Sequence, residues 1–195
     1  MGKPVQLALA LFAFSCLGLV AWQGLYNAGP SYRGRRLSSW LEDLDLDSPR
    51  SPVAATRAIR AIGTNALPVL FKMMRASDPF WKRGLLWLDA RQSFLRLRIS
   101  TALLTRGRAV QGYNALGPAA RDAVSPLIHL LESEPNVEIR SDVAAALGAI
   151  GPEARAAIPM LSLAAQSGNI QLRRSALLAL MKIQQWDQSV PSYGF

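Results

Sequence analysis

The sequence predicts an all-α protein, a short α-solenoid of helical hairpins preceded by an N-terminal transmembrane or signal-anchor helix. Two internal repeats and one apolar run support this fold class. Residues 137–150 align with 170–183 at an offset of 33 residues, and residues 115–120 align with 149–154 at an offset of 34. Repeats of this length are typical of stacked helical units, which bury a shared core and present an extended surface.

The apolar run extends from Val5 to Trp22, and Gln6 is its only strongly polar residue. As a helix with a rise of about 1.5 Å per residue, it would reach about 27 Å, enough to span the hydrocarbon core of a bilayer. A cleaved signal peptide is the alternative, but no small-x-small cleavage site follows the run. We therefore interpret residues 1–26 as a membrane anchor or signal segment and favour an uncleaved single-pass anchor.

Charges beside the anchor give conflicting indications of its orientation. Only the α-amino group and Lys3 precede it, whereas Arg33, Arg35 and Arg36 follow it closely. The positive-inside rule would keep the body of the protein in the cytoplasm. N-termini of the export type commonly translocate folded domains regardless of nearby charge. On that ground we predict a single-pass membrane protein whose repeat domain is extracytoplasmic.

Residues 27–49 are predicted to form a juxtamembrane linker and a short capping helix. Ser39 can cap this helix, and Glu42, three residues later, completes a capping box. The helix should end by residues 47–49, which read Asp-Ser-Pro. We expect it to cover the exposed end of the solenoid, because terminal repeats must shield the core from water.

The first hairpin of the repeat domain is predicted from one apolar face on each of two helices. Residues 51–62 form the first helix, with Val53 or Ala54 at the start of its inward face and Ala58, Ile59 and Ile62 continuing it. Gly63 ends this helix, and residues 66–75 return antiparallel to it. The apolar side of the returning helix consists of Leu67, Leu70, Phe71 and Met74.

Five further helices are expected, at about 101–116, 119–132, 137–150, 153–166 and 170–184. Gly-Pro pairs at 117–118 and 151–152 separate them, the glycine ending one helix and the proline starting the next. Pro126 and Pro159 recur at matching places and are expected to bend the helices that contain them.

The repeat period breaks between residues 76 and 100. A helix is expected from 79 to 91, after which residues 94–99 alternate apolar and basic side chains, the period of an extended segment. At the other end, residues 186–195 show no periodicity and are predicted to be a tail.

One motif gives the chain a family resemblance. Residues 146–154 read Ala-Leu-Gly-Ala-Ile-Gly-Pro-Glu-Ala, and residues 157–161 read Ala-Ile-Pro-Met-Leu. Here the chain resembles the HEAT-repeat superfamily of armadillo-like solenoids, in the bacterial form also called PBS-lyase HEAT-like repeats. The resemblance covers residues 50–185, apart from an irregular insert at about 76–100. It implies scaffolding or partner binding, since fold alone does not determine function.

The segment before the repeats adds to this resemblance. Residues 32–41 read Tyr-Arg-Gly-Arg-Arg-Leu-Ser-Ser-Trp-Leu. Together with the apolar N-terminus, this motif is similar to the layout of bacterial membrane-anchored or exported HEAT-repeat proteins of uncharacterised function.

The positive charge is concentrated in the middle of the chain. Residues 50–121 contain 13 Lys or Arg and two acidic residues, whereas residues 122–195 carry a net charge of −2. A positive block of this kind attracts phosphates, lipid headgroups or acidic proteins, and the alternative is a solvated face that keeps the protein soluble. The candidate partner-binding surface is a set of six arginines: Arg83, Arg91, Arg96, Arg98, Arg106 and Arg108.

No motif in the sequence indicates catalysis. His129 is the only histidine, and Cys16, the only cysteine, lies in the apolar run. The chain therefore lacks the residues for a Cys/His metal set or a nucleophile–base pair. Trp81, Trp87 and Asp89 lie among basic residues and could stack nucleic-acid bases, as in HEAT-like DNA glycosylases, or could pack the insert against the solenoid. We predict no catalytic residue, no metal and no cofactor.

The leading hypothesis for function is a non-catalytic, membrane-tethered scaffold that binds a protein partner with an acidic surface. The alternative is that the basic block at 50–121 binds anionic lipid headgroups, or nucleic acid if the body of the protein is cytoplasmic.

Overall fold

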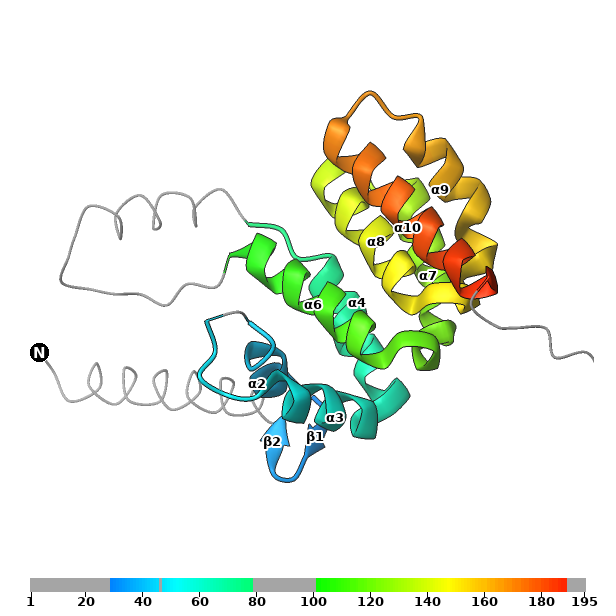
Figure 1. Cartoon of the computed structure of the whole chain (residues 1–195). Coiled ribbons are helices and arrows are strands. Elements are labelled where there is room, and N and C mark those ends of the chain that lie inside the picture. Colours follow the sequence, from blue (N-terminus) through cyan, green and yellow to red (C-terminus); the bar gives the residue numbers. More distant parts are fainter. Residues whose placement is uncertain (1–28, 46, 79–100, 189–195) are drawn as a thin grey trace, which may run out of the picture.

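The computed structural model describes residues 29–45, 47–78 and 101–188 (Figure 1). The predicted all-α class is confirmed for these residues, whose regular secondary structure is helical apart from one short hairpin of strands. The predicted membrane anchor, the helix and extended segment of the insert, and the end of the tail lie outside the described residues. Within the described ranges, no helix has both the length and the apolar character needed to cross a membrane.

The described chain begins with a β-hairpin that leads directly into the first helix. Strands β1 (Ser31–Tyr32) and β2 (Arg35–Arg36) pair antiparallel, and Arg33 and Gly34 form the turn between them. Both turn residues have positive φ, 51° and 75°, as a two-residue turn that matches the twist of a hairpin requires. The short helix α2 (Leu37–Glu42) follows without a linker.

The predicted capping box of this helix is wrong. Helix α2 begins at Leu37, two residues before Ser39, and its N-cap residue Arg36 makes no side-chain capping bond. The backbone N–H of Leu37 instead donates to the carbonyl oxygen of Pro30 at 2.9 Å. The strand hairpin brings this acceptor to the helix. A backbone carbonyl, rather than a serine side chain, therefore accepts the hydrogen bond from the N–H at the start of α2.

Helices α3 (Pro52–Ile62) and α4 (Leu67–Met74) form the predicted first hairpin, joined by a 3₁₀ turn at Gly63–Ala66. Gly63 has a φ of 63°, in the left-handed region that glycine tolerates best. This conformation explains why the first helix ends there.

The inward face of α3 agrees with the prediction except at its start. Three residues predicted to face inward are buried, namely Ala58, Ile59 and Ile62. Val53 and Ala54 are exposed, Val53 at 64%, and Ala55 takes the buried position in the first turn. The prediction for Val53 or Ala54 is therefore wrong, and an apolar side chain is left on the surface.

The remaining helices are α6 (Ala102–Leu116), α7 (Val124–Ser133), α8 (Val137–Ile150), α9 (Ile158–Ala165) and α10 (Ile170–Gln188). Short 3₁₀ segments, Gly117–Ala123 and Gly151–Ala157, precede α7 and α9, so the two helices predicted after the Gly-Pro pairs start later than expected. Pro126 and Pro159 consequently fall in the first turn of α7 and α9, where a missing N–H costs little. The bends predicted at these prolines are therefore wrong.

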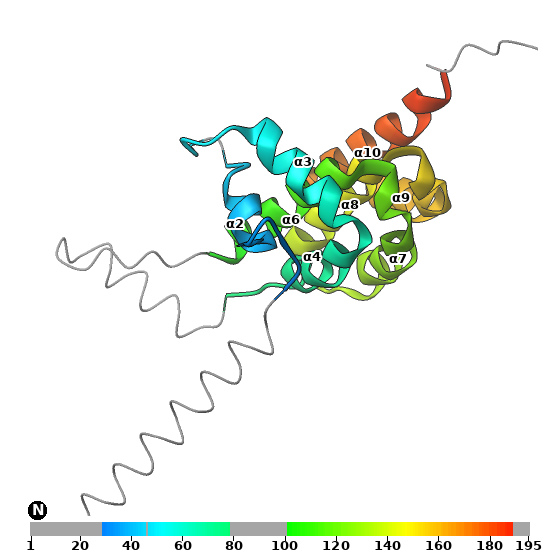
Figure 2. The same cartoon turned by 90° about the horizontal axis from the view of Figure 1, so that it is seen from below.

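The helices lie in two rows (Figures 1 and 2). In one row α3 packs against α6, α6 against α8, and α8 against α10. Helices α4, α7 and α9 form the second row, and the 3₁₀ segments between the rows also contact one another in sequence. A continuous apolar core therefore runs from the first hairpin to the last helix.

Helix α2 covers one end of this arrangement, as predicted. It packs against α3 and α6, and its Leu37 and Leu41 side chains are buried. A Cβ atom on Gly112 of α6 would lie 2.6 Å from Leu70 Cδ2 and 3.0 Å from Leu41 Cδ2. Because Gly112 has no side chain, α2 and α4 can both pack closely on α6.

Tyr113 is expected to be a site where removing an atom stabilises the protein. Its side chain is fully buried, its hydroxyl has no hydrogen-bond partner among the described residues, and burial raises the pKa of the phenol well above its usual value. Replacing Tyr113 with Phe should raise the free energy of unfolding by up to about 1 kcal/mol, since the cost of desolvating the hydroxyl disappears. Urea unfolding would measure this, and a loss of stability would reveal a partner for the hydroxyl.

Candidate partner-binding surface

Of the six arginines predicted to form a basic surface, Arg83, Arg91, Arg96 and Arg98 lie outside the described residues. The other two, Arg106 and Arg108, lie on α6. Both are engaged in ion pairs within the protein. The structure therefore gives these two arginines a role in holding helices together.

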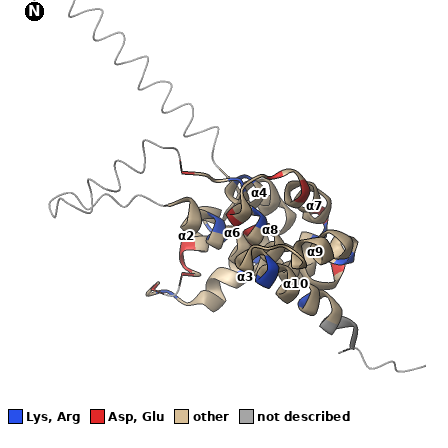
Figure 3. Ribbon diagram, turned by 90° about the horizontal axis from the view of Figure 1, so that it is seen from above, with Lys and Arg blue, Asp and Glu red and all other residues tan. Residues whose placement is uncertain are grey.

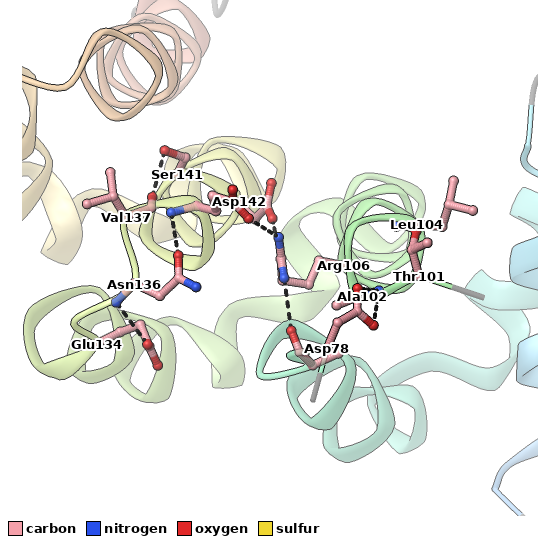
Figure 4. Close-up of polar contacts among 12 residues, drawn as sticks. Asp78, Thr101, Ala102, Leu104, Arg106, Glu134, Asn136, Val137, Ser141 and Asp142 are labelled. Carbon is pink, nitrogen blue, oxygen red and sulfur yellow. Dashed lines mark hydrogen bonds and ion pairs between the residues drawn. The ribbon is translucent and has the colours of Figure 1, made fainter. Parts of the chain in front are cut away.

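Arg106 is buried, with only 3% of its side chain exposed. Its Nε donates to Asp142 Oδ2 at 2.6 Å, its Nη2 to Glu138 Oε2 at 3.2 Å, and its Nη1 to the carbonyl oxygen of Ala76 at 2.9 Å (Figure 4). One guanidinium thus joins α6 to α8 and to Ala76, two residues after the end of α4. The prediction that Arg106 belongs to an exposed surface is wrong.

The same arginine position recurs in the next repeat. Arg140 of α8, 34 residues after Arg106, donates from Nε to the carbonyl oxygen of Leu131 near the end of α7. Arg140 thus binds a carbonyl near the C-terminal end of α7, where a positive charge is favourable, and Arg106 binds the carbonyl of Ala76, two residues after the end of α4. The 34-residue spacing of Arg106 and Arg140 is the sequence signal that could have identified this structural role.

Polar caps hold the starts of the same helices in place. Thr101 accepts a hydrogen bond from Leu104 N at the start of α6, and Asn136 accepts one from Glu138 N at the start of α8. The carboxylate of Asp78 accepts from Ala102 N at 3.0 Å, which joins the end of the first hairpin to α6 (Figure 4). These contacts fix the orientation of the helices that carry the arginines.

Asp142 is less acidic than a free aspartate. Burial raises its pKa, while the hydrogen bond from Arg106 and the positive charge of that arginine oppose the increase. The carboxylate is 19% exposed, so it is only partly shielded from water. Asp142 therefore relies on Arg106 to remain charged inside the helix stack.

Arg108 pairs with the acidic segment that follows α2. Its Nη2 lies 2.7 Å from Asp45 Oδ2, and its Nη1 lies 3.6 Å from Glu42 Oε1. The hydrogen bond to Asp45 raises the pKa of Arg108 further above its usual value. Arg108 is 21% exposed, and its charge is engaged by Asp45 and Glu42.

Asp43 holds two more arginines near the strand hairpin. It accepts from Arg35 Nη2 at 2.8 Å and from Arg50 Nη1 at 3.2 Å, and the Arg35 guanidinium lies 3.9 Å from the centre of the Trp40 ring. Burial tends to raise the pKa of Asp43, but hydrogen bonds from Arg35 and Arg50 outweigh it and keep the pKa below its usual value. This cluster fastens the hairpin to α2.

Four cations of the basic block form no ion pair with any residue in the described ranges: Arg57, Arg60, Lys72 and Arg75. All four belong to the first hairpin or to the residue directly after it, and all four are exposed. Figure 3 shows basic residues on α3, and acidic residues at the end of α2 and directly after it. Among the described residues of the basic block, these four cations of the first hairpin are therefore the ones available to a partner.

A hollow of about 380 Å³ lies on the exposed side of α3. Its lining residues are Pro52, Val53, Thr56, Arg57 and Arg60. Arg60 donates from Nε to the carbonyl oxygen of Ala115 at 2.8 Å, which fixes it against the end of α6. We call Val53, Thr56, Arg57 and Arg60 the α3 surface. The sequence pattern does not indicate this surface, because it places Val53 on the inward face of the helix.

His129, the only histidine of the sequence, lies on α7. The residue is exposed on α7 and lines a second hollow, between α4 and α7. Among the described residues, no group of three or more His, Cys, Asp or Glu side chains is placed to hold a metal ion.

Comparison of the chain with protein families, curated proteins and solved structures finds no match.

Proposed function

We propose that this protein is a membrane-tethered, HEAT-like α-solenoid that works as a non-catalytic scaffold and binds an acidic protein partner through the α3 surface. The two rows of helices and the 34-residue recurrence of the capping arginines support a solenoid. The apolar N-terminal run supports a single-pass anchor. We further propose that the repeat domain lies outside the cytoplasm.

The observation that carries the proposal is the composition of the α3 surface. Val53 is 64% exposed and provides an apolar contact, while Arg57 and Arg60 lie within two turns of it on the same helix. Arg60 is already oriented by Ala115, so little side-chain entropy is lost when it meets a carboxylate. An apolar patch beside unpaired arginines suits a partner that presents an apolar side chain next to acidic groups.

Site-specific photo-crosslinking in intact cells tests this proposal. A photoreactive phenylalanine analogue at Thr56 should form a cross-link to one protein. Replacing Arg57 with Gln should lower the yield about fivefold, as expected for the loss of about 1 kcal/mol from a charged contact. The matched control is Arg121→Gln, because Arg121 is 72% exposed and lies in the 3₁₀ segment before α7.

The outcomes separate this proposal from the alternatives. An equal yield in the Arg57 and Arg121 variants would contradict binding through the α3 surface. Cross-links to lipid alone would favour headgroup binding, and cross-links to nucleic acid would favour the nucleic-acid alternative and a cytoplasmic body.

A further inference from the structure

A second hollow, of about 360 Å³, lies between α4 and α7. Its lining residues are Phe71, Arg75, Ser125, Pro126, His129 and Leu130. They combine an aromatic and an aliphatic wall with a guanidinium, a hydroxyl and an imidazole. We call this hollow the α4–α7 groove. It belongs to the second row of helices and shares no residue with the α3 surface.

Arg75 provides the charge of the α4–α7 groove. It is the residue that ends α4, its side chain is exposed, and it forms no ion pair with any other part of the described chain. Lys72, one turn earlier on α4, is also exposed and adds positive charge to the same helix. A ligand group that meets Arg75 is therefore expected to be anionic.

His129 provides an imidazole that can hydrogen-bond a ligand and that also contacts Ser133 one turn later on α7. The hydroxyl of Ser133 donates its one proton to the carbonyl oxygen of His129, at 2.7 Å. The same hydroxyl oxygen lies 3.3 Å from Nδ1 of His129, a contact whose donor and acceptor depend on the tautomer of the ring. In the neutral tautomer that carries its proton on Nδ1, Nδ1 donates to the hydroxyl oxygen and Nε2 is an acceptor for a ligand N–H.

Phe71, Pro126 and Leu130 provide the apolar part of the groove. Phe71 is half-buried against the core, and Pro126 is exposed in the first turn of α7. An apolar side chain of a ligand can lie on these residues without burying an unpaired polar group, because α7 keeps its own backbone bonds.

We propose that the α4–α7 groove binds an extended acidic segment of a protein. A carboxylate of the segment pairs with Arg75, a backbone N–H donates to Nε2 of His129, and an apolar side chain packs on Phe71 and Pro126. An extended peptide presents all three groups within a few residues, whereas a simple anion uses Arg75 alone. This site is independent of the α3 surface, so either can fail without the other.

The test uses His129 as its own reporter, because it is the only histidine in the chain. Full-length protein, purified in detergent without a histidine tag and labelled with ¹³C at histidine Cε1, gives one imidazole signal. We expect the peptide acetyl-Glu-Leu-Glu-Leu-amide to shift that signal in a saturable way. Replacing Arg75 with Gln should lower the affinity for the peptide about tenfold, as expected for the loss of a charge-assisted hydrogen bond. Arg57→Gln and Arg121→Gln should leave this affinity unchanged.

Three results would overturn the proposal. The first is no shift of the His129 signal at millimolar peptide. The second is an equal shift with acetyl-Gln-Leu-Gln-Leu-amide, which would remove the role of Arg75. The third is equal affinity for inorganic phosphate, which would make the groove a simple anion site. The peptide comparisons use the unmodified chain, so they do not depend on the folding of any variant.

Discussion

Replacing Arg106 with Met is expected to lower the free energy of unfolding by about 2–4 kcal/mol. Methionine can fill much of the space, but it cannot donate to Asp142, to Glu138 or to the carbonyl oxygen of Ala76. The two carboxylates are 19% and 70% exposed, so water can reach both of them. The cost therefore stays below that of breaking a fully sealed ion pair. Urea unfolding of the full-length protein in detergent would measure it.

The matched control for this variant is Arg121→Met. Arg121 is 72% exposed and lies 3.7 Å from Asp122, so its loss should change the free energy of unfolding by no more than about 0.5 kcal/mol. An Arg106 variant as stable as the Arg121 variant would show that the buried guanidinium does not hold the helices together.

The loss of unfolding free energy caused by Arg106→Met, here called the deficit, should also depend on pH. Burial already raises the pKa of Asp142 in the folded protein, and removing Arg106 removes the charge that opposes this increase. A carboxyl group with a raised folded-state pKa favours folding at low pH and loses that contribution as the pH rises through the folded-state pKa. The deficit should therefore be largest at neutral pH and should shrink as the pH falls towards 4, near the usual aspartate value. Unfolding curves at several pH values would show this trend.

Replacing Gly148 with Ala is expected to destabilise the protein by about 2 kcal/mol, although alanine is the better helix former. A Cβ atom at Gly148 of α8 would lie 2.6 Å from Cα of Ala179 and 2.9 Å from its Cβ. The nearest obstacle is the backbone of α10, so no flexible side chain can move aside. Helices α8 and α10 would have to separate and lose contact along their length. Thermal and urea unfolding would give the size of the effect.

Gly107→Ala is the matched control, because Gly107 also lies inside a helix but a Cβ atom there would meet no neighbouring atom within 4 Å. This change should raise the free energy of unfolding by about 0.5–1 kcal/mol through helix propensity alone. A lower free energy of unfolding for Gly148→Ala and a higher one for Gly107→Ala would establish the close approach of α8 and α10. A stabilising Gly148→Ala would contradict it.

Much of the helical pattern could be predicted from local sequence. Helix α8 begins and ends where the repeat placed it, at Val137 and Ile150. Gly63, Gly117 and Gly151 all adopt positive φ at the ends of their helices, as the glycine positions indicated. These signals are local, because a cap or a left-handed residue acts within one turn of the helix.

The errors arose where a neighbouring hairpin or 3₁₀ segment changed the place at which a helix begins. Ser39 looked like a cap, but the carbonyl of Pro30, brought close by a strand hairpin, satisfies the start of α2 instead. Pro126 looked like a bend inside one helix, but a 3₁₀ segment places it at the start of α7. In each case the residue type was interpreted correctly but its position in the element was not.

The basic block shows most clearly which properties the sequence determines and which the tertiary structure determines. Residues 50–121 are strongly basic, and that composition alone predicts attraction to anionic partners. The acidic partners of Arg106 and Arg108 lie outside this block, in α8, at the end of α2 and in the segment after it, up to 63 residues away. The stacking of the helices brings these acids to the arginines and leaves the α3 surface and Arg75 exposed. Composition determines how much charge the chain carries, whereas tertiary packing determines which charges reach solvent, because an ion pair depends on distance in space.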